Sequence, residues 1–123
     1  MVNVTGLDHL QLAMPRGREA DARAFYGGIL GLPELQKPPN LAVRGGMGFA
    51  LGSQQFHLGV EDDFRPARKA HPAFLVQDIR TLRARLEQHG FAPYEDEPLS
   101  GYERFYVADP FGNRLEFLQP IAR

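Results

Sequence analysis

Apolar and polar residues alternate over residues 7–14, where Leu10, Leu12 and Met14 fall on one face and polar side chains on the other. This period of two predicts a half-buried strand. Apolar residues at helical spacing then predict a helix over residues 18–30. Runs of strand-forming residues, separated by proline and glycine, predict further strands over residues 34–37, 41–44, 47–51 and 55–60.

The second half of the chain repeats this order. Residues 62–69 are polar and predict a linker between modules of about residues 1–61 and 70–123, which we expect to form a single domain. The elements expected after the linker are a strand over 71–76, a helix between Asp78 as N-cap and Gly90, and strands over 91–95, 102–108 and 114–119. The pattern therefore predicts an α+β fold built from a tandem repeat.

Composition narrows the possible functions. A chain of 123 residues, 43% of them hydrophobic, can bury a real core, to which we expect Phe49, Phe56 and Phe74 to contribute. Cysteine is absent, which excludes disulfides and thiol catalysis, favours a cytoplasmic setting and restricts any metal to nitrogen and oxygen ligands. The net charge of −1 argues against nucleic-acid binding. No apolar stretch approaches the roughly 20 residues that a membrane span needs.

The repeat superposes four residues with metal-ligand side chains. His9 corresponds to His71 and His57 to Glu116, because each pair is separated by nearly the same number of residues. Each is expected on a strand, on the face opposite the large aliphatic side chains, and packed modules would bring all four to one concave surface. A single histidine of this kind is more often an ordinary hydrogen-bonded residue. The matched positions are what favour a metal site, for which zinc, nickel, cobalt, manganese and iron(II) are all suitable.

Four segments resemble a known family. Residues 7–12 (LDHLQL), 25–32 (FYGGILGL), 71–76 (HPAFLV) and 105–116 (FYVADPFGNRLE) are similar to landmarks of the vicinal-oxygen-chelate superfamily of glyoxalases, bleomycin-resistance proteins and dioxygenases. The Asp-Pro-x-Gly-Asn turn before Glu116 is the most specific of them. The resemblance implies paired βαβββ modules forming an open, cup-shaped barrel of mixed β-sheet with flanking helices, and it implies a homodimer.

The resemblance also implies a divalent metal held by His9, His71 and Glu116, with His57 as an optional fourth ligand. With His57 coordinated, the site suits Lewis-acid chemistry on a small oxygen-chelating substrate, with Glu116 moving a proton, as in a lyase, isomerase or transferase. Without it, the remaining triad suits an iron(II) ring-cleaving dioxygenase. The alternative for His57 is a hydrogen bond to a neighbour such as Gln55. A metal-free drug-binding protein is a third hypothesis, which the intact ligand set argues against.

The chain departs from the known subfamilies at several positions. It has Ala13 where glyoxalase I has an arginine, and it has Gln11 and Asp96 where fosfomycin-resistance transferases have threonine and lysine. Tyr106 and Ser100 match the latter family. The candidate catalytic residues are Glu116, Tyr106 and Arg104, and the candidate substrate-binding residues are Gln11, Arg44 and Ser100.

Overall fold

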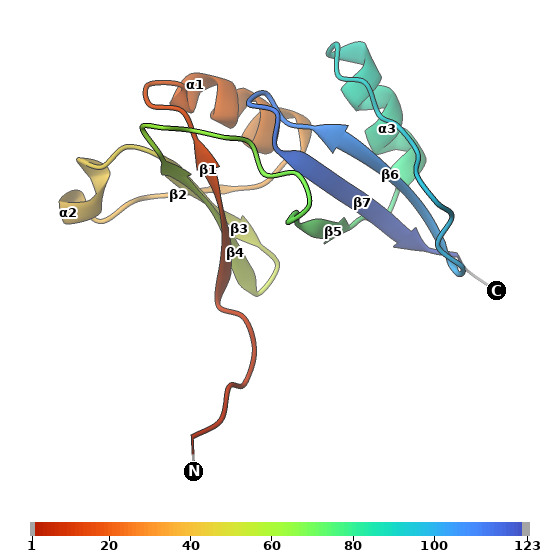
Figure 1. Cartoon of the computed structure of the whole chain (residues 1–123), viewed down its shortest axis with the longest axis horizontal. Coiled ribbons are helices and arrows are strands. Elements are labelled where there is room, and N and C mark those ends of the chain that lie inside the picture. The colour runs from red at the N-terminus through yellow and green to blue at the C-terminus, as the bar shows by residue number, and fades with distance from the viewer. Residues whose placement is uncertain (1, 122–123) are drawn as a thin grey trace. The chain divides into compact units, whose positions relative to one another are not determined.

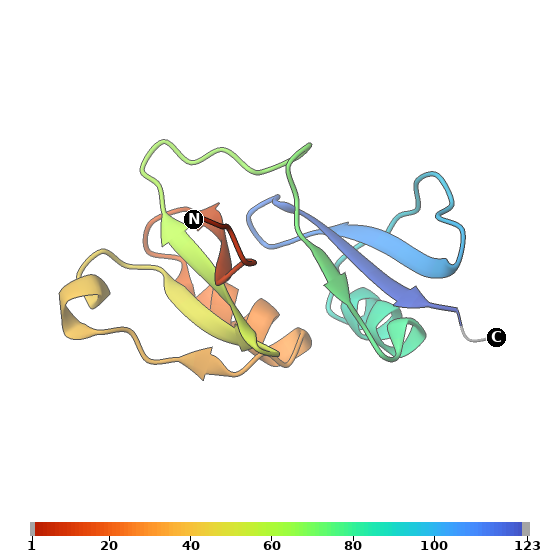
Figure 2. The same cartoon turned by 90° about the horizontal axis from the view of Figure 1, so that it is seen from below.

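The computed structural model describes residues 2–121, which form two compact units that divide between Phe64 and Arg65 (Figures 1 and 2). Each unit contains a small mixed β-sheet, with three helical segments in the first unit and one helix in the second. Among residues 2–121, no helix is long and apolar enough to cross a membrane. The predicted α+β class, with strand–helix–strand order in both halves, is confirmed.

The first unit is a four-stranded sheet with a helix against it. Its elements are β1 (His9–Met14), α1 (Glu19–Ala22), η1 (Arg23–Ile29), β2 (Glu34–Leu35), α2 (Pro39–Ala42), β3 (Met47–Leu51) and β4 (Gln54–Val60). The strand order is β1-β4-β3-β2, and β1 runs parallel to β4. The α-helical turn α1 continues directly into η1, which has π-helical hydrogen bonding and contains Gly27 and Gly28, both poor helix formers.

Aromatic packing joins the helix to one face of this sheet. Tyr26 is fully buried, and its ring centroid lies 4.9 Å from that of Phe56 and 5.9 Å from that of Phe49. Met14 and Leu12 extend the same buried face along β1. Because side chains alternate along a strand, His57 and Gln11 are directed to the opposite face of the sheet.

The second unit is a three-stranded sheet with strand order β5-β7-β6. Its elements are β5 (Ala73–Leu75), α3 (Ile79–Gln88), β6 (Tyr102–Ala108) and β7 (Arg114–Pro120). Asp78 caps α3 as predicted, since its carboxylate accepts the Thr81 amide hydrogen bond. In its core the ring of Phe117 stacks on that of Phe74 and is tilted against that of Phe105. The core positions predicted for Phe49, Phe56 and Phe74 are confirmed.

Three predictions about local structure were wrong. Residues 41–44 were predicted as a strand, but the chain there leaves the short helix α2, which begins at Pro39 because the fixed φ of proline suits a first helical position. Residues 91–95 form no strand, and only Tyr94 pairs in an isolated bridge with Tyr106. His71 was expected on a strand, but β5 begins two residues later.

The Asp109–Asn113 segment is a buried turn that fixes the start of β7. Asp109 Oδ1 accepts hydrogen bonds from the amides of Phe111 and Asn113, at 2.9 and 2.8 Å. Asn113 in turn donates to Asp109 Oδ2 and accepts from the Ala67 amide. The turn is therefore a structural motif, and its place in the chain sets the register of Glu116 on β7.

Candidate metal and substrate site

Two histidines meet on the open face of the first unit. The rings of His9, at the start of β1, and His57, on β4, stack with centroids 4.3 Å apart and planes 22° apart. His9 Nδ1 lies 3.0 Å from Asp8 Oδ2, a contact in which the ring nitrogen donates to the carboxylate. That hydrogen bond directs the lone pair of His9 to Nε2, the nitrogen then free to bind a metal.

His57 is held in place by its neighbours. Its Nε2 lies 2.8 Å from Gln55 Oε1, which is the hydrogen bond named above as the alternative to metal coordination. Because the amide oxygen accepts, the lone pair of the neutral ring lies on Nδ1. Burial and the nearby His9, followed by the positive charge of Lys37, lower the pKa of His57, while Asp8 acts in the opposite direction. A neutral imidazole is the form that binds metal ions. Gly48 faces His57 across β3 and β4, and a Cβ atom there would lie 3.2 Å from the ring.

A histidine and a carboxylate meet in the second unit. His71 Nε2 lies 2.8 Å from Glu116 Oε1, and His71 Nδ1 lies 2.9 Å from the carbonyl oxygen of Lys69. Both contacts are hydrogen bonds only when both ring nitrogens carry protons, because both partners are acceptors. With Nδ1–H held by Lys69, a cation beside Glu116 could replace the proton on Nε2.

Two further candidate residues surround Glu116. Arg104 Nη1 donates to Glu116 Oε2 at 3.2 Å, and Arg104 also donates to the backbone carbonyl of Glu97. Tyr106 pairs directly with Glu116 in the β6–β7 ladder. The guanidinium groups of Arg104 and Arg114 lie 5.4 and 4.2 Å from the centroid of its buried ring. Burial raises the pKa of Tyr106, and the charge of Glu116 adds to the effect.

The carboxylate of Glu116 is nearly buried, with 8% of the residue exposed. Burial is the largest influence and would raise its pKa, but hydrogen bonds from His71 and Arg104, together with their charges, outweigh it and lower the pKa. Glu116 is therefore an ionised carboxylate with a different partner on each oxygen.

The two pairs occupy equivalent positions in their units. His57 pairs in register with Gln11 on the neighbouring parallel strand, and His9 lies two residues before Gln11. Glu116 pairs in register with Ala73, and His71 lies two residues before Ala73. The strand register thus reproduces the repeat that the sequence predicts.

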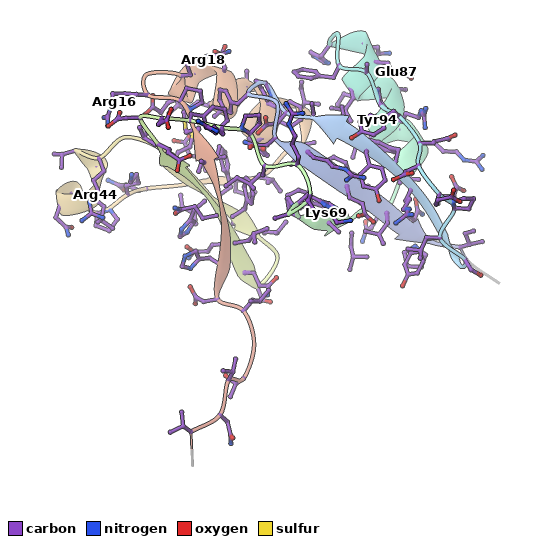
Figure 3. The ribbon with its side chains drawn as sticks, in the orientation of Figure 1. Arg16, Arg18, Arg44, Lys69, Glu87 and Tyr94 are labelled. Carbon is purple, nitrogen blue, oxygen red and sulfur yellow. The ribbon has the colours of Figure 1, made fainter. Side chains whose placement is uncertain are left out.

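Two of the three predicted substrate-binding residues line a cavity, and the third does not. Gln11 and Arg44 line a cavity of about 480 Å³ in the first unit, together with His57 (the location of Arg44 is shown in Figure 3). Gly59 makes room for Gln11, since a Cβ there would lie 2.6 Å from the Gln11 amide. Ser100 lies in the exposed turn before β6, and within residues 2–121 its hydroxyl makes no hydrogen bond.

Two contributors were missed by the sequence analysis. Arg114 stacks on Tyr106 and pairs with Asp96, and its period-two spacing from Glu116 could have placed it on the same face. Lys37 lines the cavity with Arg44, but the chain around it was interpreted only as a strand.

Three imidazole rings and one carboxylate are side chains of the kind that bind divalent transition-metal ions. In each unit a histidine at or just before the start of a strand uses Nδ1 for an oxygen partner and is paired with a second ligand-type side chain. Within either unit, as far as residues 2–121 are concerned, no three such side chains cluster tightly enough to hold a metal alone. Neither the His9–His57 pair nor the His71–Glu116 pair alone therefore supplies the three or more side chains that a protein-held metal ion usually needs.

Comparison with solved structures identifies several similar chains. A protein from Bacillus anthracis described as a glyoxalase family protein shares 45% identity over 98% of this chain and 99% of its own, with a TM-score of 0.92. A glyoxalase/dioxygenase from Nostoc punctiforme is 21% identical over 99% and 100% of the two chains, with a TM-score of 0.76. No curated protein matches the sequence.

A mutant of the fosfomycin resistance protein FosX from Listeria monocytogenes was solved with Mn(II) and 1S,2S-dihydroxypropylphosphonic acid. It is 17% identical to this chain over 97% and 95% of the two chains, with a TM-score of 0.79, a level of identity that supports the shared fold alone. The family model described as the Glyoxalase/Bleomycin resistance protein/Dioxygenase superfamily matches residues 6–117. The chain belongs to this superfamily.

Proposed function

We propose that this protein is a metal-dependent, glyoxalase-like enzyme that activates a small oxygen-chelating substrate and moves a proton on it. One observation supports the proposal above the others. Each unit presents a pair of ligand-type side chains, His9 with His57 and His71 with Glu116, at the same register of its sheet. A protein that only enclosed a drug would need neither imidazole nor carboxylate at these matched positions.

The metal would be held by His9, His71 and Glu116, with His57 as fourth ligand. When bound, a divalent ion supplies Lewis-acid stabilisation of negative charge on a substrate oxygen. FosX, which has the same fold, was solved with Mn(II), so manganese is a sensible first ion to test. Nickel, zinc, cobalt and iron(II) suit the same nitrogen and oxygen donors.

The chain's own residues provide the proton chemistry. Glu116 is the proposed base, because it is an ionised, nearly buried carboxylate with a partner on each oxygen. Arg104 holds Oε2 and so fixes the carboxylate's orientation. Tyr106, opposite Glu116 in the ladder, would orient a carbonyl or anionic group, while Gln11 and Arg44, which line the cavity, would bind the rest of the substrate. Ser100, in the exposed turn before β6, stays a predicted substrate-binding residue.

Proton transfer can be tested without knowing the natural substrate. Metal content would first be measured on untagged protein purified without chelators, and the loaded protein would then be incubated with hydroxyacetone in D₂O. Proton NMR should show exchange at the carbon next to the carbonyl, and Glu116→Gln should abolish it. Exchange that continues unchanged in Glu116→Gln would overturn the assignment of the base.

The same preparation separates the alternatives. Iron that is retained in His57→Ala, together with oxygen uptake on catechol, would indicate the ring-cleaving dioxygenase. Absence of stoichiometric metal after reconstitution would leave a small-molecule binding protein. The expected homodimer is tested on the same sample by sedimentation velocity.

A further inference from the structure

The cavity of the first unit has a distinctive chemical composition. Its volume is about 480 Å³, within the range of sites for small organic ligands. Leu35, Pro38 and Leu41 provide apolar surface, and the amides of Gln11 and Gln36 provide neutral polar groups. Among its lining residues there is no aspartate or glutamate, whereas two are cations, Lys37 and Arg44.

Arg44 differs from the other arginines of this unit. Arg16, Arg18 and Arg23 are each paired with a carboxylate, at 2.8, 2.8 and 2.7 Å. Arg44 has no side-chain hydrogen bond or ion pair with any residue in the described range 2–121. Its five N–H donors are consequently available to a ligand.

The local chain conformation holds the two cations beside the cavity. Arg44 is followed by Gly45 and Gly46, both with positive φ, and a Cβ at Gly46 would lie 2.2 Å from the Leu58 carbonyl oxygen. Only glycine permits this close approach. The Gly46 amide donates to Glu19 Oε2 at 2.8 Å, and the Lys37 ammonium donates to the Gly45 carbonyl, leaving two of its three donors.

We infer that this cavity binds a small organic anion, with Lys37 and Arg44 holding a carboxylate or phosphonate group and Leu35, Pro38 and Leu41 contacting an apolar body. His57 lines the same cavity, so the bound anion would lie beside a proposed metal ligand. Only the statement that the bound anion is the enzyme's substrate rests on the proposed function. Anion binding itself requires no metal.

The test uses the full chain without metal, so that a carboxylate cannot bind through the ion. Benzoate, phenylphosphonate and the neutral benzamide would be titrated separately and followed by isothermal titration calorimetry. Benzoate and benzamide have nearly the same shape and differ in charge. We expect at least one anion to bind roughly tenfold or more tightly than benzamide, since hydrogen bonds to charged groups are the stronger ones. Which anion binds identifies the class of acidic group.

The variants Arg44→Gln and Lys37→Gln should each weaken anion binding several-fold. Arg16→Gln removes the same charge from the same unit but lies outside the cavity lining, and it should leave binding unchanged. Circular dichroism would verify that all three fold. Equal affinity for benzamide, no binding of either anion, or equal losses in Arg16→Gln and Arg44→Gln would each overturn the inference.

Manganese titration of the same protein keeps the two proposals distinguishable. If the protein binds the anion selectively but binds no stoichiometric metal, the anion site stands and the proposed function is contradicted. If it binds metal but shows no preference for anions, the proposed function stands and the anion site is contradicted.

Discussion

Glu116 accepts a hydrogen bond from His71 at 2.8 Å, although 45 residues separate the two along the chain. The parallel pairing of β5 with β7 brings them together, because Ala73 pairs with Glu116 and His71 lies just before β5. In the first unit the parallel pairing of β1 with β4 brings His9 to His57 in the same way. The same strand register in both units thus produces two equivalent pairs of candidate ligands.

Replacing Glu116 by glutamine should lower divalent-metal affinity by roughly a hundredfold or more, since the proposed site would lose its charged ligand. The amide retains the size of the side chain and can still accept from Arg104, so the fold should persist. Glu103→Gln, also on the second sheet and paired with Arg80 at the surface, is the matched control. Manganese affinity would be measured by electron paramagnetic resonance. An equal loss in both variants would show that the change in net charge explains the effect, and it would contradict a role of Glu116 as ligand.

Gly48→Ala should disturb His57 without unfolding the protein. The new methyl group would lie 3.2 Å from the His57 Cδ2 atom, which is closer than side chains normally pack, so the ring must shift away. We expect a changed His57 ring resonance in the NMR spectrum, weaker metal binding and a loss of about 1 kcal/mol in the free energy of unfolding. An unchanged His57 resonance would mean that the ring tolerates the contact.

Asn113→Ala should lower the free energy of unfolding by about 2 kcal/mol, because Asn113 is fully buried and its removal leaves the Ala67 amide and the Asp109 carboxylate with fewer partners. Urea denaturation measures the change. Asn40→Ala, on the exposed helix α2, is the control and should stay within about 0.5 kcal/mol. Equal stabilities of the two variants would refute the structural role of the Asp109–Asn113 turn.

Two glycines with open space around them should respond oppositely to alanine. At Gly17 the added methyl group would meet no atom within 4 Å beyond the immediate chain neighbours, and at Gly28 none beyond these and the backbone of its own helix. Gly17 has φ +81°, whereas Gly28 lies within η1. Gly28→Ala should stabilise the protein by about 0.5–1 kcal/mol and Gly17→Ala should destabilise it by about 1 kcal/mol. Thermal unfolding of both variants tests the sign. The same sign for both would show that φ does not decide the effect.

Much of the fold could be predicted from residue patterns. The alternation in residues 7–14, the Asp78 cap and the glycine at position 90 each indicated an element that the structure contains. The prediction for residues 41–44 was wrong because a short apolar run is compatible with either a strand or a helix. The preceding Pro38 and Pro39 favour the start of a helical turn at this place. Residues 91–95 lacked a neighbouring strand to pair with beyond one bridge.

The candidate site was accessible to sequence analysis only in part. The repeat predicted the equivalence of His9 with His71 and of His57 with Glu116, which the strand registers reproduce. The position of Lys37 in the cavity lining could not be predicted from the sequence. The path of the chain from β2 to β3 depends on the Gly45–Gly46 turn and on its tertiary contacts. Local periodicity does not contain that information.

The central claim is that both ligand pairs bind one divalent ion, and its most direct test is a manganese titration of His9→Ala, His57→Ala, His71→Ala and Glu116→Gln. The control is His89→Ala, whose ring bonds the Arg85 carbonyl at the end of α3. We predict one ion per chain, with affinity strongly reduced in His9→Ala, His71→Ala and Glu116→Gln, less so in His57→Ala, and unchanged in His89→Ala. The claim would be contradicted if manganese did not bind stoichiometrically. It would also be contradicted if the variants of one pair, either His9 and His57 or His71 and Glu116, bound manganese as tightly as the unchanged protein.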